Sequence, residues 1–176
     1  MTVLVGHMSA DGSTREIAER IAAGLRRAGL AAEARSLAEV TDADAYEAFV
    51  LGSAVHRQNW LPPAVDFLRG DLEVLRARPV WIFSVGMPDA LRGPFRRMGP
   101  MEVPVIEKGL PAGLGYRDHR LFSGVVTADR LPRTGRIAFR LLGGRYGDYR
   151  DWGAIDAWTA RIAAALHAAP HGPPTA

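Results

Sequence analysis

The run Pro79–Gly86, with the sequence PVWIFSVG, is the segment that most constrains the fold. Ser84 is its only polar side chain, so the run lacks the alternation expected of a half-exposed strand. Uninterrupted apolar strands are typical of parallel sheets that carry helices on both faces. The run is also much shorter than the roughly 18 residues that a membrane-spanning helix needs. It therefore predicts a buried strand of an α/β sheet.

Apolar runs alternate with amphipathic helical stripes along the rest of the 176-residue chain. This alternation predicts βαβ units, and hence a doubly wound parallel sheet of five strands. Strands are expected at Thr2–Gly6, Ala31–Leu37, Tyr46–Gly52, Pro79–Gly86 and His119–Val126, and helices over Ser13–Arg27, from Pro62 with a break at Gly70-Asp71, and from Asp151. Residues 1–167 are predicted to form one domain, and residues 168–176 a disordered tail.

The first predicted helix has signals at both ends. Ser13-Thr14-Arg15-Glu16 fits a capping box, and Gly29 suits the left-handed residue that ends many helices. The loop before it, Ser9–Thr14, is rich in hydroxyl groups. Because a helix N-terminus attracts anions, Ser9, Ser13 and Thr14 are expected either to bind a terminal phosphate or only to cap the helix.

Doubly wound sheets bind ligands at the carboxyl ends of the strands, where the strand order reverses. The loops that follow the third and fourth strands, Ser53–Trp60 and Ser84–Asp89, begin with small residues that let a flat heteroaromatic ring approach the backbone. Two readings stay open for Trp60, which either contacts that ring or packs in the core. His56 is expected to be a loop residue or a substrate contact.

Four segments carry a resemblance to a known family: Ser9–Ala18, Leu51–Val55, Leu142–Gly144 and Tyr149–Trp152. Together they resemble flavodoxin-domain proteins, and are most similar to the menaquinone-dependent protoporphyrinogen dehydrogenase branch. The resemblance implies a flavodoxin-like fold with strand order 2-1-3-4-5, non-covalently bound FMN, and one- or two-electron redox chemistry.

The FMN contacts that we expect lie in the three loops. They are Ser9, Ala10, Asp11, Gly12, Ser13 and Thr14 for the phosphate, with Ser53, Ala54, Val55, His56, Gln58, Asn59, Trp60, Val85, Gly86, Met87, Pro88 and Asp89 around the ring. Two features depart from the family pattern. Asp11 stands where ordinary flavodoxins have Ser or Thr, and the connection from Gly144 to Tyr149 is shorter than in the porphyrinogen enzymes.

The charge is distributed unevenly. Residues 1–75 carry 7 Arg and 11 acidic residues, whereas residues 76–176 carry 15 basic and 8 acidic residues, which gives −4 and +7. Carrier flavodoxins are usually acidic, so this basic chain is expected to be an FMN-dependent oxidoreductase with a small substrate or quinone acceptor. The alternatives are an electron carrier for a protein partner and a binding module that has lost its cofactor.

A basic stretch provides the candidate surface for a substrate or membrane. Arg133, Arg136 and Arg140 alternate with apolar residues at helical spacing, so a helix here can clamp carboxylates or rest on an anionic membrane, or can be an ordinary surface helix. With His56 and Arg57, these arginines are the candidate substrate contacts.

Several other classes are excluded or not expected. The chain has no cysteine, which excludes disulfides, iron–sulfur clusters and Cys-based zinc sites. We recognise no metal-ligand spacing, no P-loop, no hydrolase nucleophile elbow and no nucleic-acid-binding signature. Without a visible signal peptide, the expected location is the cytoplasm, with possible contact at the membrane surface.

Overall fold

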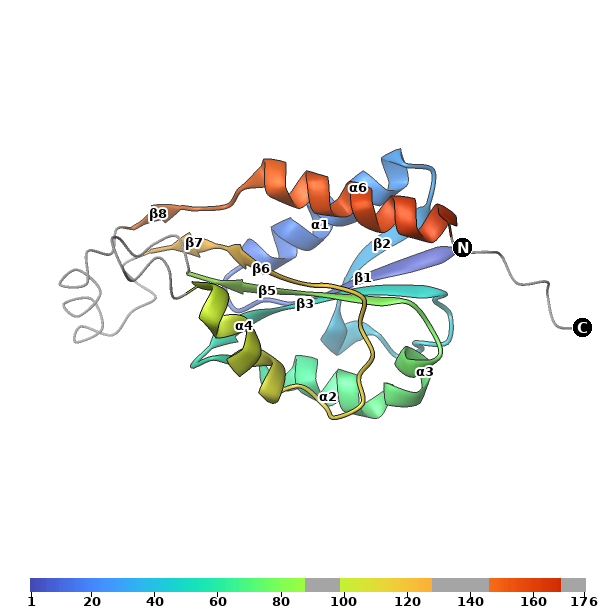
Figure 1. Ribbon diagram of the computed structural model, residues 1–176, viewed down its shortest axis with the longest axis horizontal. Helices are drawn as coiled ribbons and strands as arrows, with labels where there is room; N and C mark the ends of the chain where they lie inside the picture. The colour runs from blue at the N-terminus through green and yellow to red at the C-terminus, as the bar shows by residue number, and fades with distance from the viewer. Residues whose placement is uncertain (88–98, 128–145, 169–176) are drawn as a thin grey trace, which may run out of the picture.

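The computed structural model describes residues 1–87, 99–127 and 146–168, and a parallel sheet lies at its centre (Figure 1). Its main strands are β1 (Thr2–Met8), β2 (Ala31–Ser36), β3 (Ala48–His56), β5 (Val80–Gly86) and β6 (His119–Ser123). They run in the order β2-β1-β3-β5-β6, and each neighbouring pair is parallel. Strands β5 and β6 are the fourth and fifth of the five predicted strands, so this is the predicted order 2-1-3-4-5. The predicted α/β fold and its strand order are therefore confirmed.

Helices cover both faces of the sheet (Figure 1). On one face lie α1 (Ser13–Arg27) and α6 (Trp152–Ala168), and on the other α2 (Pro62–Gly70), α3 (Leu72–Arg76) and α4 (Gly99–Lys108). Each face has its own apolar core, because successive side chains of a strand point to opposite sides. Phe83 and Trp158 meet edge to face in the first core, and Phe49 lies in the second.

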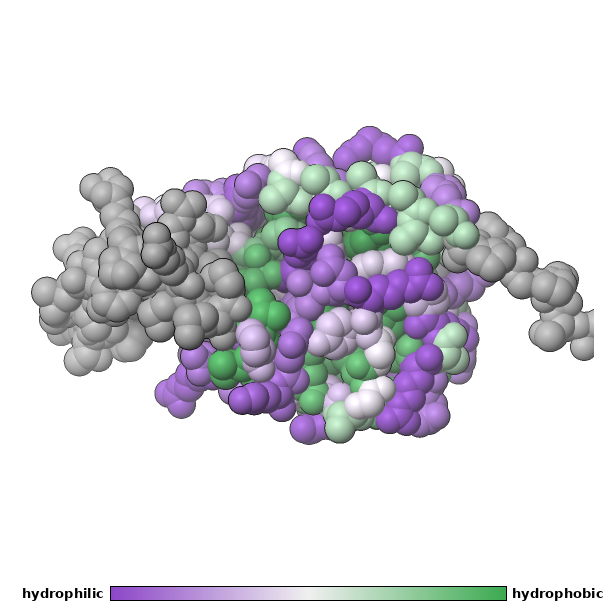
Figure 2. Space-filling model, in the orientation of Figure 1, coloured by the Kyte–Doolittle hydropathy of each residue, from purple (hydrophilic) through white to green (hydrophobic). Residues whose placement is uncertain are grey.

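The helices bury their apolar stripes, so the face shown in Figure 2 intersperses hydrophilic with hydrophobic residues. Within the described residues, none of the helices has both the length and the apolar composition that crossing a bilayer would require. Residues 169–176 of the predicted tail lie outside the described part of the chain.

Helix α1 has the predicted bounds, but the predicted capping box does not form. The N-cap is Gly12, with φ of 91°, and no side chain among the described residues caps the helix. Glu16 instead forms an ion pair with Arg150. At the other end Gly29, with φ of 86°, donates to the carbonyl of Arg26 (3.0 Å), as predicted for a left-handed C-terminal glycine.

Two predicted strands end in different places. Strand β3 continues four residues beyond Gly52, because β1 and β5 pair with it on either side and β4 (Asn59–Trp60) pairs with its end. The predicted strand His119–Val126 is interrupted at Gly124. Beyond this break, β7 (Val125–Val126) leaves the main sheet and pairs antiparallel with β8 (Gly147–Asp148).

Candidate functional site at the carboxyl ends of the strands

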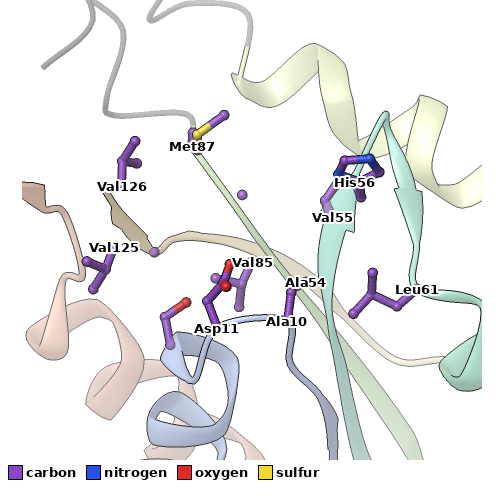
Figure 3. Close-up of a pocket in the computed structure, with 13 residues that line it drawn as sticks. Ala10, Asp11, Ala54, Val55, His56, Leu61, Val85, Met87, Val125 and Val126 are labelled. Atoms are coloured by element: carbon purple, nitrogen blue, oxygen red, sulfur yellow. The ribbon is translucent and has the colours of Figure 1, made fainter. Parts of the chain in front are cut away.

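A cavity of about 250 Å³ opens where β1, β3 and β5 end, beside the turn between β6 and β7 (Figure 3). Doubly wound sheets bind ligands at this edge. The helix that follows β1 and the helix that follows β3 cover opposite faces of the sheet, which leaves a crevice between the ends of the two strands. The lining residues are Ala10, Asp11, Ser13, Ala54, Val55, His56, Leu61, Val85, Gly86, Met87, Gly124, Val125 and Val126. Mostly aliphatic walls with a few polar groups are typical of a site for a flat organic ligand.

The first predicted loop forms one side of this cavity, at the N-terminus of α1. The hydroxyl of Ser9 accepts a hydrogen bond from the amide of Gly12 (2.8 Å), which closes the turn. Thr14 is fully buried, and its hydroxyl has no hydrogen-bond partner in the described part of the chain. A buried hydroxyl without a partner costs about 1–3 kcal/mol, so the first turn of α1 carries a donor that is unsatisfied within the described residues, next to the lining residue Ser13.

Asp11 lies in the same loop and brings a negative charge to the cavity. Figure 3 shows its carboxylate pointing into the cavity toward Val85. A carboxylate next to a phosphate is unfavourable unless donors separate the two charges.

The second predicted loop is a tight hairpin between β3 and β4. Arg57 and Gln58 form its two-residue turn, with φ of 50° and 64°. Positive φ at both positions defines a type I′ turn, which usually contains Asn and Gly. This geometry keeps His56 at the edge of the cavity and leaves Arg57, Gln58 and Asn59 exposed beyond it.

Two residues of this predicted loop face the core and do not line the cavity. Trp60 is 3% exposed, and its indole donates to the hydroxyl of Ser84 (2.8 Å), so this side chain packs in the core. The hydroxyl of Ser53 donates to the carbonyl of Ala54 (2.9 Å) and accepts from the amide of Leu61 (3.0 Å). Both side chains hold the hairpin in place.

The third loop contributes Val85, Gly86 and Met87 to the cavity. The rest of it, Pro88 and Asp89, lies outside the described residues, and so do the arginines at 133, 136 and 140.

Four lining residues were not predicted from the sequence: Leu61 beside the β3–β4 hairpin, and Gly124, Val125 and Val126 on the opposite side of the cavity (Figure 3). The amide of Gly124 donates to the carbonyl of Gly86 (2.9 Å). A Cβ at position 124 would lie 2.9 Å from Val85 and 3.1 Å from the Ser13 hydroxyl, so only glycine fits this approach without displacement. The available signal was Gly124 itself, a glycine within the fifth predicted strand.

Comparison with known proteins agrees with this architecture. A family model described as the flavodoxin domain matches residues 4–150. Among curated proteins the sequence has no match.

Several solved structures share the fold. A flavodoxin from the domain Archaea superposes with a TM-score of 0.57 at 17% identity, and flavodoxin 2 from Bacillus cereus with 0.58 at 20%; each alignment covers 95% of this chain and 99% of that one. Rubredoxin oxygen:oxidoreductase from Desulfovibrio gigas gives 0.60 at 16% identity, over 95% of this chain and 36% of that one.

Proposed function

This chain belongs to the flavodoxin domain family, and from this premise we propose that its cavity binds FMN and that the protein is an FMN-dependent oxidoreductase. The observation that carries the proposal is the position of the Thr14 hydroxyl. It is buried, unpartnered within the described residues, and sits in the first turn of a helix that begins beside the cavity.

The residues present fit the two ends of FMN. Ser13, Thr14 and the amides of the first turn of α1 would hold the phosphate, because this helix end has positive partial charge and no side-chain cap among the described residues. Ala54, Val55 and Val85 provide flat aliphatic walls for the isoalloxazine ring. When bound, FMN supplies one- or two-electron transfer.

The protein's own contribution is positioning. The aliphatic walls would shield part of a bound ring from water, and His56 at the edge of the cavity is one of the polar groups placed to contact a substrate or the edge of the ring. Arg57, exposed at the tip of the hairpin next to it, is the neighbouring cation.

We further propose a small acceptor such as a quinone. The support comes from the net charge of +3, from the aliphatic surface of Met87, Val125 and Val126 at the cavity, and from the sequence resemblance to a quinone-dependent branch. In this proposal the basic residues Arg133, Arg136 and Arg140 serve contact with an anionic substrate or membrane surface. An electron carrier to a protein partner is the second candidate.

A titration with FMN tests the proposal. The purified apoprotein should bind FMN with quenching of flavin fluorescence and a one-to-one endpoint. No binding at high micromolar FMN would refute it and would favour a module without cofactor, as the carboxylate of Asp11 in the phosphate loop would allow.

A second experiment separates the enzyme from the carrier. The reduced holoprotein is mixed with a soluble naphthoquinone and, separately, with an electron-accepting haem protein. Fast oxidation by the quinone alone supports the oxidoreductase, and fast oxidation by the haem protein alone supports the carrier.

A further inference from the structure

A chain of hydrogen bonds, buried at Trp60 and part-buried at Glu107, crosses the second core on the α4 side of the sheet. The indole of Trp60 donates to the hydroxyl of Ser84 (2.8 Å). That hydroxyl lies 2.9 Å from Nε2 of His119, and Nδ1 of the same ring lies 3.0 Å from the carboxylate of Glu107. The chain therefore joins β4, β5, β6 and α4.

One placement of the protons on the His119 ring and the Ser84 hydroxyl gives every donor in this chain an acceptor. If His119 is neutral with its proton on Nδ1, the ring donates to Glu107 and accepts from the hydroxyl of Ser84, which in turn accepts from Trp60. Every donor then has an acceptor. If Nε2 also carries a proton, the hydroxyl of Ser84 faces two donors and must turn its own proton away.

The surroundings favour the neutral ring. The side chain of His119 is 3% exposed, and burial lowers its pKa, an effect that the charges of Glu107 and Asp118 partly oppose. Tyr116 packs edge-on against the ring at 6.2 Å. Burial and its bond to Glu107 raise the pKa of Tyr116 to about 12, so that hydroxyl stays a donor. Asp118 also accepts from Trp158 and Arg120.

The Ser, His and Glu side chains have the order of a hydrolytic triad, but they cannot act as one. Ser84 has no exposed surface, and its oxygen already accepts a hydrogen bond from Trp60. A nucleophile must reach its substrate, so the chain has a structural role.

The chain ends at the wall of the cavity. Trp60 pairs with Val55 across the hairpin, and Leu61 follows it; both Val55 and Leu61 line the cavity. On the other side, the side-chain oxygen of Asn59 lies so close to Gly109, just after α4, that a Cβ there would approach it to 2.7 Å. The hairpin therefore lies next to the end of α4 and is linked to that helix through the hydrogen-bond chain.

We propose that His119 is a positioning residue of the cavity: its neutral ring fixes Trp60 through Ser84, and protonation of the ring releases the hairpin that carries Val55 and His56. The part of this proposal that concerns the ligand rests on the proposed FMN function. The coupling between His119 and the hairpin does not, and it is tested in the apoprotein.

The test is an NMR titration of the ¹⁵N-labelled apoprotein from neutral to mildly acidic pH. We expect the Trp60 indole signal and the amides of the hairpin to shift with the same apparent pKa as the His119 ring. The titration is run in the His56→Gln background, because His56 lies in the hairpin itself. In that background His119→Gln, which cannot titrate, should abolish these shifts. The control His167→Gln, at an exposed histidine on α6, should leave them in place.

Ser84→Ala removes the link at every pH. Hydrogen exchange of the hairpin amides should then accelerate about tenfold, the factor for one lost buried hydrogen bond. A hairpin that neither shifts with His119 nor exchanges faster in Ser84→Ala would overturn the proposal.

A third experiment measures the dissociation constant of FMN as a function of pH. Because the phosphate of FMN also takes up a proton at about pH 6 in both proteins, the comparison between them is the readout. Wild-type affinity should fall more steeply with decreasing pH than the affinity of His119→Gln. An apoprotein that shows the coupled NMR shifts but binds no FMN refutes the proposed function alone, and leaves the coupling established.

Discussion

The guanidinium of Arg150 forms an ion pair with the carboxylate of Glu16, and so joins the segment before α6 to the first turn of α1. Arg150 also pairs with Asp148 and lies 4.7 Å from the centre of the Trp152 ring. Its side chain is only 11% exposed. This cluster holds the strand β8 and the start of α6 against the loop that borders the cavity.

Replacing this arginine should destabilise the protein. We expect Arg150→Ala to lower the free energy of unfolding by about 1–2 kcal/mol, from the loss of charge-assisted hydrogen bonds and the contact with Trp152. The control is Arg69→Ala, which removes an exposed ion pair with Asp66. This control should change the free energy of unfolding by less than about 0.5 kcal/mol. Equal effects in urea unfolding would show that the Arg150 cluster contributes no more than a surface pair.

The hairpin turn stores strain that glycine would relieve. Gln58 has φ of 64°, where a Cβ is unfavourable, so Gln58→Gly should stabilise the protein by about 0.5–1 kcal/mol. Gln58→Ala keeps the Cβ and is the matched control, with little expected change. A glycine variant no more stable than the alanine variant in thermal unfolding would contradict this account.

Thr14 provides a test in which stability and binding change in opposite directions. Thr14→Val keeps the shape and removes a buried hydroxyl that lacks a partner in the described residues, so the apoprotein should gain about 1 kcal/mol. FMN affinity should fall about tenfold, as expected for one lost hydrogen bond to a charged group.

The control for Thr14 is Thr159, which is also buried but donates to the carbonyl of Ile155 (2.8 Å). Thr159→Val should not stabilise the protein or change FMN affinity. If Thr14→Val binds FMN as tightly as wild type does, the hydroxyl is not a phosphate donor.

Gly124 should be intolerant of any side chain. A Cβ there would lie 2.9 Å from Val85 and 3.1 Å from Ser13, so Gly124→Ala should destabilise the protein by about 1–3 kcal/mol and weaken FMN binding. Gly70→Ala adds a Cβ into open space at the end of α2 and should be tolerated. Calorimetry of both variants, with and without FMN, checks the expectation, which fails if they behave alike.

Stability should fall in mild acid because of two histidines. Burial lowers the pKa of both His7 and His119 below the ordinary value of 6.5. Below that value the unfolded chain binds protons that the folded chain excludes, so the free energy of unfolding decreases until the pH reaches the folded-state pKa. The midpoints of urea unfolding at about pH 7.5 and about pH 5.5 measure this pH-dependent loss of stability. His119→Gln should reduce it, and a midpoint independent of pH would contradict the buried neutral state of both rings.

Local patterns in the sequence determined the elements and much of the topology. The spacing of apolar residues identified α1, the uninterrupted run ending at Gly86 identified β5, and the alternation of strands and helices implied that the strands are parallel. These predictions succeed because they rest on interactions within a few residues. The same alternation placed the cavity at the carboxyl ends of the strands, since that edge follows from the winding of the sheet.

The tertiary structure alone decided which partner each polar side chain takes. Glu16 fits a local cap but pairs with Arg150, 134 residues away, and Trp60 follows a strand end like a ligand contact but bonds to Ser84 in the core. Likewise, Gly124 becomes a wall of the cavity only because β5 and α1 approach it. Spacing along the chain carries no information about such partners, because a hydrogen bond or a close contact depends on distances that exist only once the strands and helices have packed.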